Sequence, residues 1–491
     1  MQYKYSTHST SHDNSLIELS SNITDYIRTH FGEEFLINYK QYHNSQYKPY
    51  LRTSQLCDID NLELELKRSG IHLEPIPKIK NAFRITSGED VVSKTLEFIL
   101  GKYYIQSLSS MIPALVLNPK SNDTVLDLCA APGSKTTQLA ELMNNHGTLI
   151  ANEISVDRLK SLVFNVDKMS LVNVGILHGK GELLSKQFEN RIDKILVDAP
   201  CSALGIVQKK GEVSHWWNQR KAEAMSDLQL RLLIAAIKMC KVGGEIVYST
   251  CTLTLEENEV VINKVLNKYP VELEEIELPL RGNEGHTKFG NEILNNELKK
   301  TRRIFPWEIE SEGFFVAKLK KIDKTEPVEK TVRQEKRYDL IKSSSGKVNG
   351  YLKILSDYYG IDRNKFDDYK YLIKNNDIHF VCNDWNSDHL ESFNRIGTRL
   401  GTIDKRGILQ LNPLAAQVFG EAITKNIIEL ENVSELNIYF TGGTIKKQLQ
   451  VGGQKVVRYK NYFLGTAVAS KEGLKSQFPR AFRTQEIIFP Q

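Results

Sequence analysis

The sequence predicts an α/β fold whose centre is a doubly wound, Rossmann-like sheet. From about residue 123 onward, short apolar segments rich in β-branched residues alternate with longer segments of helical periodicity. Alternation of this kind is typical of a mostly parallel sheet with helices on both faces. Such sheets bind ligands at the carboxyl ends of their strands. The residues that directly follow each predicted strand are therefore the candidates for function.

The predicted elements follow one another in a regular order. The first strand covers residues 124–130 and leads into a helix over Ser134–Asn145. Strands are then predicted over 148–153, 173–178, 194–200 and 244–251, and helices over 156–169, 222–240 and 256–269. Residues 314–321 predict a further, antiparallel strand that closes the sheet at its edge. Helical periodicity also runs through Leu16–Phe31, ahead of the sheet.

The composition is that of a globular protein with several domains. At roughly 150 residues per domain, the 491 residues correspond to about three domains. No apolar run approaches the roughly 20 residues that cross a bilayer, and the polar start does not resemble a secretory signal, so we expect a cytoplasmic protein. The six cysteines include no C-x-x-C pair, so we expect no zinc or other metal centre.

Changes in composition divide the chain into six predicted segments. They are a disordered start (1–14), a small N-terminal domain (15–90), the α/β domain (91–321), a charged linker (322–349), an intermediate C-terminal domain (350–430) and a small barrel-like module (431–491). Two stretches have the composition of an RNA-binding surface. Tyr39–Thr53 interleaves tyrosines with basic residues, and Lys446–Arg483 contains nine Lys or Arg against one acid. A merely solvated basic face is the alternative for the second stretch.

The loop after the first strand predicts a cofactor site. Residues 129–135 read Cys-Ala-Ala-Pro-Gly-Ser-Lys, which has too few glycines for a dinucleotide loop, and Ser134 separates Gly133 from Lys135, unlike the adjoining Gly-Lys of a P-loop. S-adenosylmethionine fits better, because small residues let the backbone approach it. The helix that begins near Gly133 can bind its carboxylate. Glu153 ends the next strand, where an acid can accept hydrogen bonds from both ribose hydroxyls.

Two cysteines lie at the ends of later strands and border the same crevice. Cys201 follows Asp198-Ala-Pro, and Cys251 follows Tyr248-Ser-Thr. Carbon 5 of cytosine is a poor nucleophile, but a thiolate that adds at carbon 6 makes it enamine-like and able to accept a methyl group. Asp198 can hydrogen-bond the base during this addition. An amino-group methyltransferase would instead carry an Asp/Asn-Pro-Pro-aromatic loop. These residues do not rank the two thiols.

These motifs resemble the Sun-type RNA 5-methylcytosine methyltransferase family, and most of all its branch that modifies bacterial small-subunit ribosomal RNA. The segments that carry the resemblance are 74–77, 103–111, 125–143, 151–160, 195–202, 243–259 and 302–321. More weakly, residues 464–483 resemble the PUA-type RNA-binding module of that branch. The resemblance therefore implies a methyltransferase domain between a small N-terminal RNA-binding domain and a C-terminal PUA-like module.

The resemblance also implies the site residues. It makes Cys251 the nucleophile and Cys201 a second thiol that assists proton loss or product release, with Asp198 beside them. The implied contacts of S-adenosyl-L-methionine are Cys129, Ala130, Ala131, Pro132, Gly133, Ser134, Lys135, Glu153 and Asp198. One position departs from the family, because Lys180 stands where an acid usually lies near the adenine. Glu182 or a backbone group would then replace that acid.

The function implied is methylation of carbon 5 of a cytosine in RNA, with 16S ribosomal RNA as the favoured substrate. The expected partners are RNA and the small ribosomal subunit, with no membrane, and the expected state is a monomer. Two alternatives stay open, a tRNA cytosine-5 methyltransferase and a non-catalytic RNA-binding ribosome-assembly factor. The presence of both Cys201 and Cys251 favours an enzyme, since a binding protein needs neither thiol.

Overall fold

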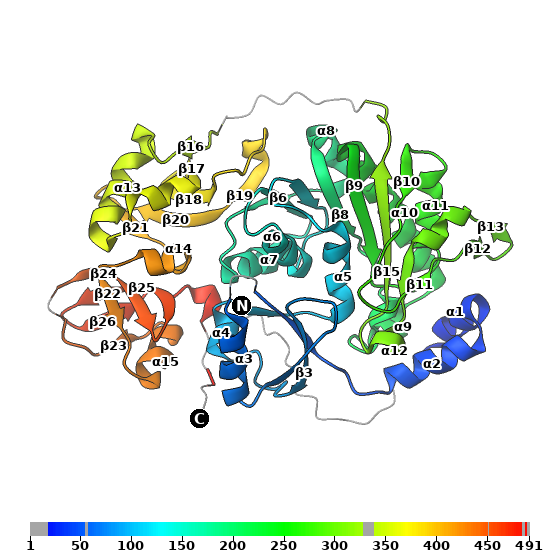
Figure 1. Ribbon diagram of the computed structural model, residues 1–491, viewed down its shortest axis with the longest axis horizontal. Coiled ribbons are helices and arrows are strands. Elements are labelled where there is room, and N and C mark those ends of the chain that lie inside the picture. Colours follow the sequence, from blue (N-terminus) through cyan, green and yellow to red (C-terminus); the bar gives the residue numbers. More distant parts are fainter. Residues whose placement is uncertain (1–17, 55–56, 328–337, 450, 484–486, 489–491) are drawn as a thin grey trace.

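The described part of the chain forms five β-sheets, of which the largest lies at the centre of the molecule (Figure 1). This computed structural model describes residues 18–54, 57–327, 338–449, 451–483 and 487–488. The predicted disordered start at 1–14 lies outside these residues, as does part of the predicted linker. Among the described residues, no helix has both the length and the apolar character needed to cross a membrane.

Parallel strands form the middle of the central sheet, in the order β9-β8-β5-β6-β7. They are β5 (Thr124–Asp127), β6 (Thr148–Glu153), β7 (Val174–His178), β8 (Ile192–Asp198) and β9 (Cys240–Thr250). Each coincides with a predicted strand, although β9 begins at Cys240 rather than at Gly244. The carboxyl ends of these strands meet at one edge of the sheet, which confirms the predicted α/β architecture.

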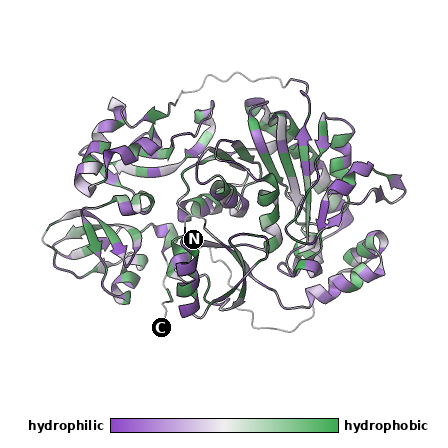
Figure 2. Cartoon of the chain, viewed as in Figure 1, coloured by the Kyte–Doolittle hydropathy of each residue, from purple (hydrophilic) through white to green (hydrophobic). Residues whose placement is uncertain are grey.

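Helices cover both faces of this sheet. One face is covered by α5 (Leu108–Leu117), α6 (Ser134–Leu142) and α7 (Val156–Lys168), and the other by α10 (Gln219–Met239) and α11 (Glu259–Leu266). Successive side chains of β5 point to opposite faces of the sheet. Val125 packs on the face that α5, α6 and α7 cover, and Leu126 packs on the face that α10 and α11 cover. Figure 2 shows the resulting apolar centre between polar outer surfaces.

The sheet continues beyond β9 with antiparallel strands. β15 (Phe314–Lys321) pairs antiparallel with β9, as predicted. However, the expectation that it closes the sheet is wrong, because β14 (Arg302–Ile304) pairs with its other side and β11 (Asn283–Glu284) pairs with β14. Most residues of β15 are buried, as befits an internal strand. β10 (Val271–Leu273) also pairs with β15.

The N-terminal region contributes two separate units. The helices α1 (Ser21–Phe31) and α2 (Glu33–His43) pack against residues 204–217 of the α/β domain. A four-stranded sheet follows in the order β2-β3-β1-β4, made of β1 (Tyr50–Thr53), β2 (His72–Pro75), β3 (Ala82–Ser87) and β4 (Tyr103–Ile105), with α3 (Ile59–Arg68) and α4 (Leu96–Ile99). This sheet therefore extends past residue 90, where the sequence had suggested a domain boundary.

The tyrosine-rich stretch 39–53 does not present the row of stacking aromatics that its composition suggests. Tyr39, Tyr42 and Tyr50 are buried, and only Tyr47 among its tyrosines is exposed. The hydroxyl of Tyr39 donates a hydrogen bond of 2.6 Å to the carbonyl of Leu204. The tyrosines of α2 thus form a core face at helical spacing rather than an RNA-binding surface.

The C-terminal region forms two five-stranded sheets. The first contains β16 (Ile341–Lys342), β17 (Tyr369–Lys374), β18 (Asp377–Cys382), β20 (Thr398–Ile403) and β21 (Leu409–Leu411), with α13 (Gly346–Tyr359) and α14 (Pro413–Phe419). The second contains β22 (Ile427–Glu429), β23 (Thr444–Ile445), β24 (Gly453–Tyr459), β25 (Tyr462–Ser470) and β26 (Gly473–Ser476), with α15 (Val433–Thr441). The second sheet occupies most of the module predicted over 431–491.

One C-terminal strand joins the central sheet. β19 (Phe393–Ile396) pairs antiparallel with β7, so the sheet is built from segments more than 200 residues apart in the chain. The guanidinium of Arg395 on β19 forms a two-pronged ion pair with Asp167 of α7. Trp385 and Phe393 pack directly on Gly175 of β7, where even a Cβ atom would clash. The C-terminal region is thereby docked on the central α/β domain.

Candidate active site

The loop between β5 and α6 is shaped for the close approach of a ligand. Gly133 has a φ of 107°, which favours glycine, and a Cβ there would lie 3.1 Å from Leu162. Residues of α7 hold the loop from behind, because Asn165 donates to the carbonyl of Pro132 at 2.8 Å and Arg158 donates to that of Ala131. The sequence-predicted residues 129–135 therefore line the carboxyl edge of the sheet as expected.

Two buried carboxylates flank this loop. Asp127 accepts a hydrogen bond of 2.7 Å from Thr136 through Oδ2, while its buried Oδ1 has no hydrogen-bond partner among the described residues. Burial raises the pKa of Asp127 to about 7. Glu153 is also buried and accepts from the backbone N–H of Ser155 at 2.8 Å. A free carboxylate oxygen beside a small-residue loop suits the ammonium group of S-adenosylmethionine, so these residues fit that cofactor.

The structure brings the two strand-end thiols together. Cys201 follows β8, Cys251 follows β9, and their Sγ atoms are 3.2 Å apart. Both side chains are partly accessible. The hydrogen bond to Cys251, together with burial, raises the pKa of the Cys201 thiol well above its usual value. Both influences favour the protonated form of Cys201.

Lys135 links the cofactor loop to the cysteines. Its ammonium group forms a 2.8 Å ion pair with Asp198 and donates to the hydroxyl of Ser110 at 2.9 Å. The other oxygen of Asp198 accepts from Ser249 at 2.8 Å. Although burial opposes it, the attraction of Asp198 and of Cys251 raises the pKa of Lys135. A fixed positive charge thus lies close to the thiols.

A second lysine near the cysteines was not anticipated from the sequence. Lys209 forms a 3.1 Å ion pair with Glu312, whose other oxygen accepts from Ser107 at 2.7 Å. The attraction of Glu312, with a further contribution from Cys251, raises the pKa of Lys209. A second ammonium group thus lies near Cys251. Lys209 and Glu312 lie in irregular segments, where periodicity gives no signal, although each follows a recognisable motif.

Glu257 fastens the two cysteine loops to each other. It lies on the segment after Cys251 and is fully buried. Its carboxylate accepts from the backbone N–H of Ser202 at 2.9 Å and also from the Ser202 hydroxyl, beside Cys201. Thr254 and Gln229 each donate to it at 2.8 Å. These bonds fix the relative position of the loops that carry the thiols.

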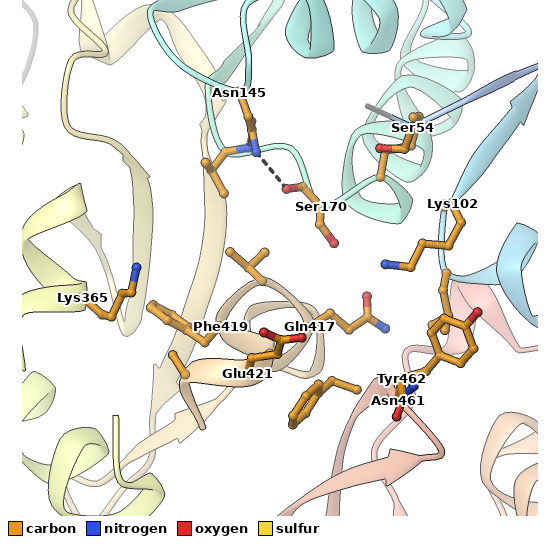
Figure 3. Close-up of a pocket in the computed structure, with 18 of the residues that line it drawn as sticks. Ser54, Lys102, Asn145, Ser170, Lys365, Gln417, Phe419, Glu421, Asn461 and Tyr462 are labelled. Carbon is orange, nitrogen blue, oxygen red and sulfur yellow. Dashed lines mark hydrogen bonds between the residues drawn. The ribbon is translucent and has the colours of Figure 1, made fainter. Parts of the chain in front are cut away.

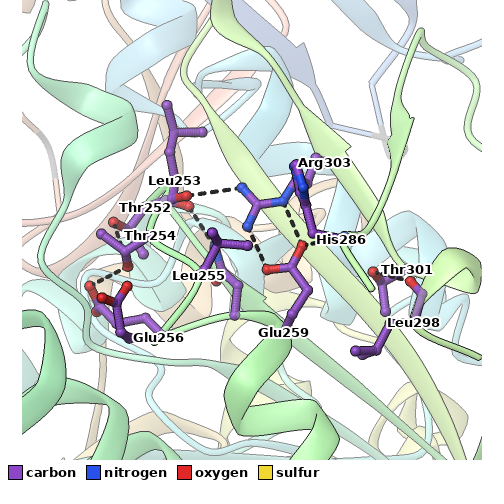
Figure 4. A network of polar contacts seen from close by, with 12 residues as sticks. Thr252, Leu253, Thr254, Leu255, Glu256, Glu259, His286, Leu298, Thr301 and Arg303 are labelled. Carbon is purple, nitrogen blue, oxygen red and sulfur yellow. Dashed lines mark hydrogen bonds and ion pairs between the residues drawn. The ribbon is translucent and has the colours of Figure 1, made fainter. Parts of the chain in front are cut away.

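A buried ion pair holds the same segment from the other side (Figure 4). Arg303 of β14 and Glu259 of α11 are both fully buried, and the guanidinium donates two hydrogen bonds to the carboxylate. A third bond of 2.9 Å runs from Arg303 to the carbonyl of Leu253. The segment after Cys251 therefore has a fixed course before any substrate binds.

The two residues considered for the adenine contact lie after β7. Lys180 is exposed, and Glu182 is half-buried on a short helical turn, Gly181–Leu183. A Cβ at Gly181 would lie 2.8 Å from Leu232, so the backbone of this turn packs closely on α10.

Comparisons with known proteins match this chain to RNA methyltransferases. A family model described as 16S rRNA methyltransferase RsmB/F matches residues 114–320. The tRNA (cytosine(49)-C(5))-methyltransferase of Pyrococcus abyssi is 37% identical over 279 residues, which cover 56% of this chain and 89% of that protein. The ribosomal RNA small subunit methyltransferase F of Vibrio parahaemolyticus is 31% identical over 438 residues, which cover 86% of this chain and 88% of that protein.

A solved structure is similar as well. The crystal structure of a methyltransferase homologue from Pyrococcus horikoshii has a TM-score of 0.56 and 32% identity, and the match covers 62% of this chain and 96% of that one. The cofactor loop and both thiol loops lie within the matched family region of residues 114–320. The chain belongs to the RsmB/F family of S-adenosylmethionine-dependent RNA cytosine-C5 methyltransferases.

Proposed function

We propose that this chain methylates carbon 5 of a cytosine in 16S ribosomal RNA through a covalent bond between Cys251 and carbon 6. The observation that carries the proposal is the 3.2 Å separation of the Cys201 and Cys251 Sγ atoms at the carboxyl edge of the sheet. Similarity over 86% of the chain to a small-subunit ribosomal RNA enzyme favours that RNA. The tRNA enzyme matches only 56% of the chain, so tRNA is the second candidate.

The covalent step follows from the charges around the thiols. The Cys251 thiolate adds to carbon 6 of cytosine, and the electron pair of the carbon 5–carbon 6 double bond moves toward the ring nitrogen and amino edge. Asp198, held by Lys135 and Ser249, hydrogen-bonds that edge. Carbon 5 is then nucleophilic. S-adenosylmethionine supplies an electrophilic methyl group for it.

Release of the product requires a proton transfer. Once carbon 5 carries both its hydrogen and the methyl group, a base removes the proton, the double bond re-forms and the sulfur–carbon 6 bond breaks. Cys201 lies next to the departing sulfur and assists this step. Cys251 leaves as a thiolate, which the nearby ammonium groups of Lys135 and Lys209 favour.

The cofactor contacts are proposed for the small-residue loop and the neighbouring carboxylates. Residues Cys129–Ser134 approach the cofactor through their backbone, Glu153 accepts from the ribose hydroxyls, and Asp198 borders the reacting methyl group. Lys135 belongs to the same loop, but its ammonium group is directed at Asp198. We add Asp127, whose free Oδ1 suits the ammonium group of the methionine portion.

The flanking regions are proposed to bind RNA. The N-terminal domain contains the sheet of β1 to β4. The module over 431–491 is proposed to be PUA-like and to contact RNA through exposed cations of the basic segment Lys446–Arg483, such as Lys471 and Lys475. The intermediate domain over 350–430 is attached to the central sheet through β19. Monomeric state, cytoplasmic location and the small ribosomal subunit as a partner stay predictions.

Methyl transfer from labelled S-adenosylmethionine tests the function directly. The assay offers 16S ribosomal RNA, assembled small subunits and tRNA to the enzyme, and bisulfite sequencing then locates the modified cytosine. We expect incorporation into 16S ribosomal RNA, its loss in Cys251→Ala, and its retention in Cys57→Ser, which alters a thiol of the N-terminal domain. RNA binding without any methyl transfer would instead identify a ribosome-assembly factor.

A further inference from the structure

A cavity of about 710 Å³ lies where four parts of the chain meet (Figure 3). Its walls come from the turn before β4, the loops after α6 and α7, the end of α14 and the turn between β24 and β25. Its size lies within the range of about 300 to 1,000 Å³ that is typical of ligand sites. None of the residues that line it belongs to the active site described above.

The cavity lies at the edge of the central sheet opposite the cysteines. Asn145 stands between α6 and β6, and Ser170 stands between α7 and β7, so both mark the amino ends of parallel strands. Cys201 and Cys251 follow the carboxyl ends of such strands. The cavity therefore serves neither the cofactor nor the target base.

The walls of the cavity are joined by contacts between distant parts of the chain. Phe164 of α7 stacks on Phe482 of the C-terminal module, with ring centroids 4.3 Å apart. The hydroxyl of Tyr462, which lines the cavity, donates to the carboxylate of Glu97 at 3.3 Å. The cavity is thus part of the folded architecture and not a gap between loosely attached domains.

An unpaired cation points into this cavity. Lys102 is half-buried, and its ammonium group has no ion-pair or hydrogen-bond partner within the ranges that the structure describes. Lys102, Ser170 and Gln417 converge from three different walls (Figure 3). The amide nitrogen of Gln417 donates to the carbonyl of Leu464 at 2.9 Å, which leaves its oxygen as an acceptor. A partly desolvated ammonium group without a partner is stabilised by an anionic ligand.

The remaining groups limit the kind of anion. The partly buried rings of Tyr462 and Phe463 lie beside Asn461 on the turn between β24 and β25, within the basic segment Lys446–Arg483. Glu421 also lines the cavity and opposes a ligand with several negative charges. One phosphodiester with an attached base meets all of these conditions, because aromatic rings stack on bases and amide side chains bond to base edges.

We propose that this cavity binds an unpaired nucleotide of the substrate RNA, remote from the target cytosine, with a phosphodiester at Lys102 and the base against Tyr462. The inference rests on the proposed function in that the ligand is the RNA substrate. It adds a second point of attachment, which holds the RNA across the molecule while the target base enters the active site.

Equilibrium binding of 16S ribosomal RNA as a function of salt tests this site. We expect Lys102→Glu to weaken binding about tenfold and to lower the slope of log affinity against log salt by about one. Lys102→Arg should bind as the natural protein does. Lys353→Glu makes the same change of net charge on the exposed surface of α13 and should leave affinity unchanged. Cofactor affinity and turnover at saturating RNA should be unaltered in all three variants.

A photo-crosslinking residue at the exposed position Asn461 gives an independent readout. We expect a crosslink to an RNA nucleotide other than the methylated cytosine. Unchanged affinity and salt slope in Lys102→Glu, with no crosslink from position 461, would overturn the proposal. So would tight binding of a free nucleoside monophosphate that RNA does not displace.

The two proposals fail in different ways. If the natural protein methylates no RNA at all, the proposed function fails whatever the cavity does. If methylation proceeds normally and Lys102→Glu still binds RNA like the natural protein, only the cavity proposal fails. Thermal unfolding of each variant establishes that the fold is intact before either conclusion is drawn.

Discussion

Cys201 and Cys251 are in contact at 3.2 Å, yet their surroundings differ. The hydrogen bond that Cys201 donates to Cys251, together with burial, favours the protonated form of Cys201. Cys251 instead lies near the ammonium groups of Lys135 and Lys209. The sequence placed both thiols at one edge of the sheet but did not rank them, because the ranking depends on charges that come from other segments.

Glu257 sets the geometry of this pair without touching the substrate. In Glu257→Gln one carboxylate oxygen becomes an NH₂ group that faces hydrogen-bond donors of Ser202, Thr254 or Gln229. We expect a loss of about 1–3 kcal/mol in the free energy of unfolding, together with slower turnover at unchanged cofactor affinity. Denaturant unfolding and methyl transfer measure the two effects. The exposed Glu272→Gln is the control, and full turnover in Glu257→Gln would contradict the role.

The raised pKa of Asp127 predicts that binding of the cofactor depends on pH. With a pKa of about 7 in the free protein, its carboxyl group is protonated at pH 6 and ionised at pH 8. Burial is the main cause, the negative charge of Asp198 adds to it, and Thr136 and Lys135 oppose it. Only the ionised form attracts an ammonium group. Affinity for S-adenosylmethionine should therefore rise with pH across this range.

Calorimetric titration at pH 6, 7 and 8 checks this dependence. The affinity for S-adenosylmethionine at pH 8 should be nearly tenfold that at pH 6, a difference of about 1.4 kcal/mol in binding free energy. Asp127→Asn removes the titrating group and should bind weakly at every pH. An equally steep rise with pH in Asp127→Asn would assign the effect to another group.

Elements differ in how far the sequence could predict them. β5 to β9 alternate with helices and carry local apolar patterns, so both their existence and their order along the chain were predictable. The pairing of β19 with β7 was not, because it joins segments far apart in the chain and leaves no local pattern. The prediction that the tyrosines of α2 form an RNA-binding surface was wrong for a related reason. Their helical spacing marks a buried face, which composition alone does not reveal.

Arg303 links β14 to α11 and to the segment that carries Cys251. Arg303→Met leaves the buried carboxylate of Glu259 without a counter-charge and with only the backbone N–H of His286 as a donor, which should cost about 3–5 kcal/mol in the free energy of unfolding. The double variant Arg303→Met/Glu259→Leu removes both charges and should recover most of that stability. Denaturant unfolding of both variants measures these changes in the free energy of unfolding. Equal loss in the single and the double variant would show that packing, and not the charge, is responsible.

At the scale of the whole molecule, the C-terminal region is part of one assembly with the catalytic sheet. Its docking depends on β19 and on the ion pair between Arg395 and Asp167, whose side chains are 15% and 11% exposed. A cavity with an unpaired lysine lies at the same junction. If the cavity binds RNA as we propose, the substrate is held at both edges of the central sheet.

A double-mutant cycle measures this docking. Asp167→Asn and Arg395→Gln should each destabilise the protein, and together by less than the sum, with a coupling on the order of 1–3 kcal/mol. Denaturant unfolding of the four proteins supplies the numbers. Strict additivity would mean that the ion pair contributes nothing to the attachment of the C-terminal region.

Trapping of the covalent intermediate tests the central claim most directly. Cys201→Ala, incubated with 16S ribosomal RNA and S-adenosylmethionine, should accumulate a protein–RNA adduct that survives a denaturing gel. Mass spectrometry should place the bond between Cys251 and a cytosine, and Cys201→Ala/Cys251→Ala should form none. An adduct that persists in the double variant, or its absence from Cys201→Ala and Cys251→Ala alike, would contradict the account.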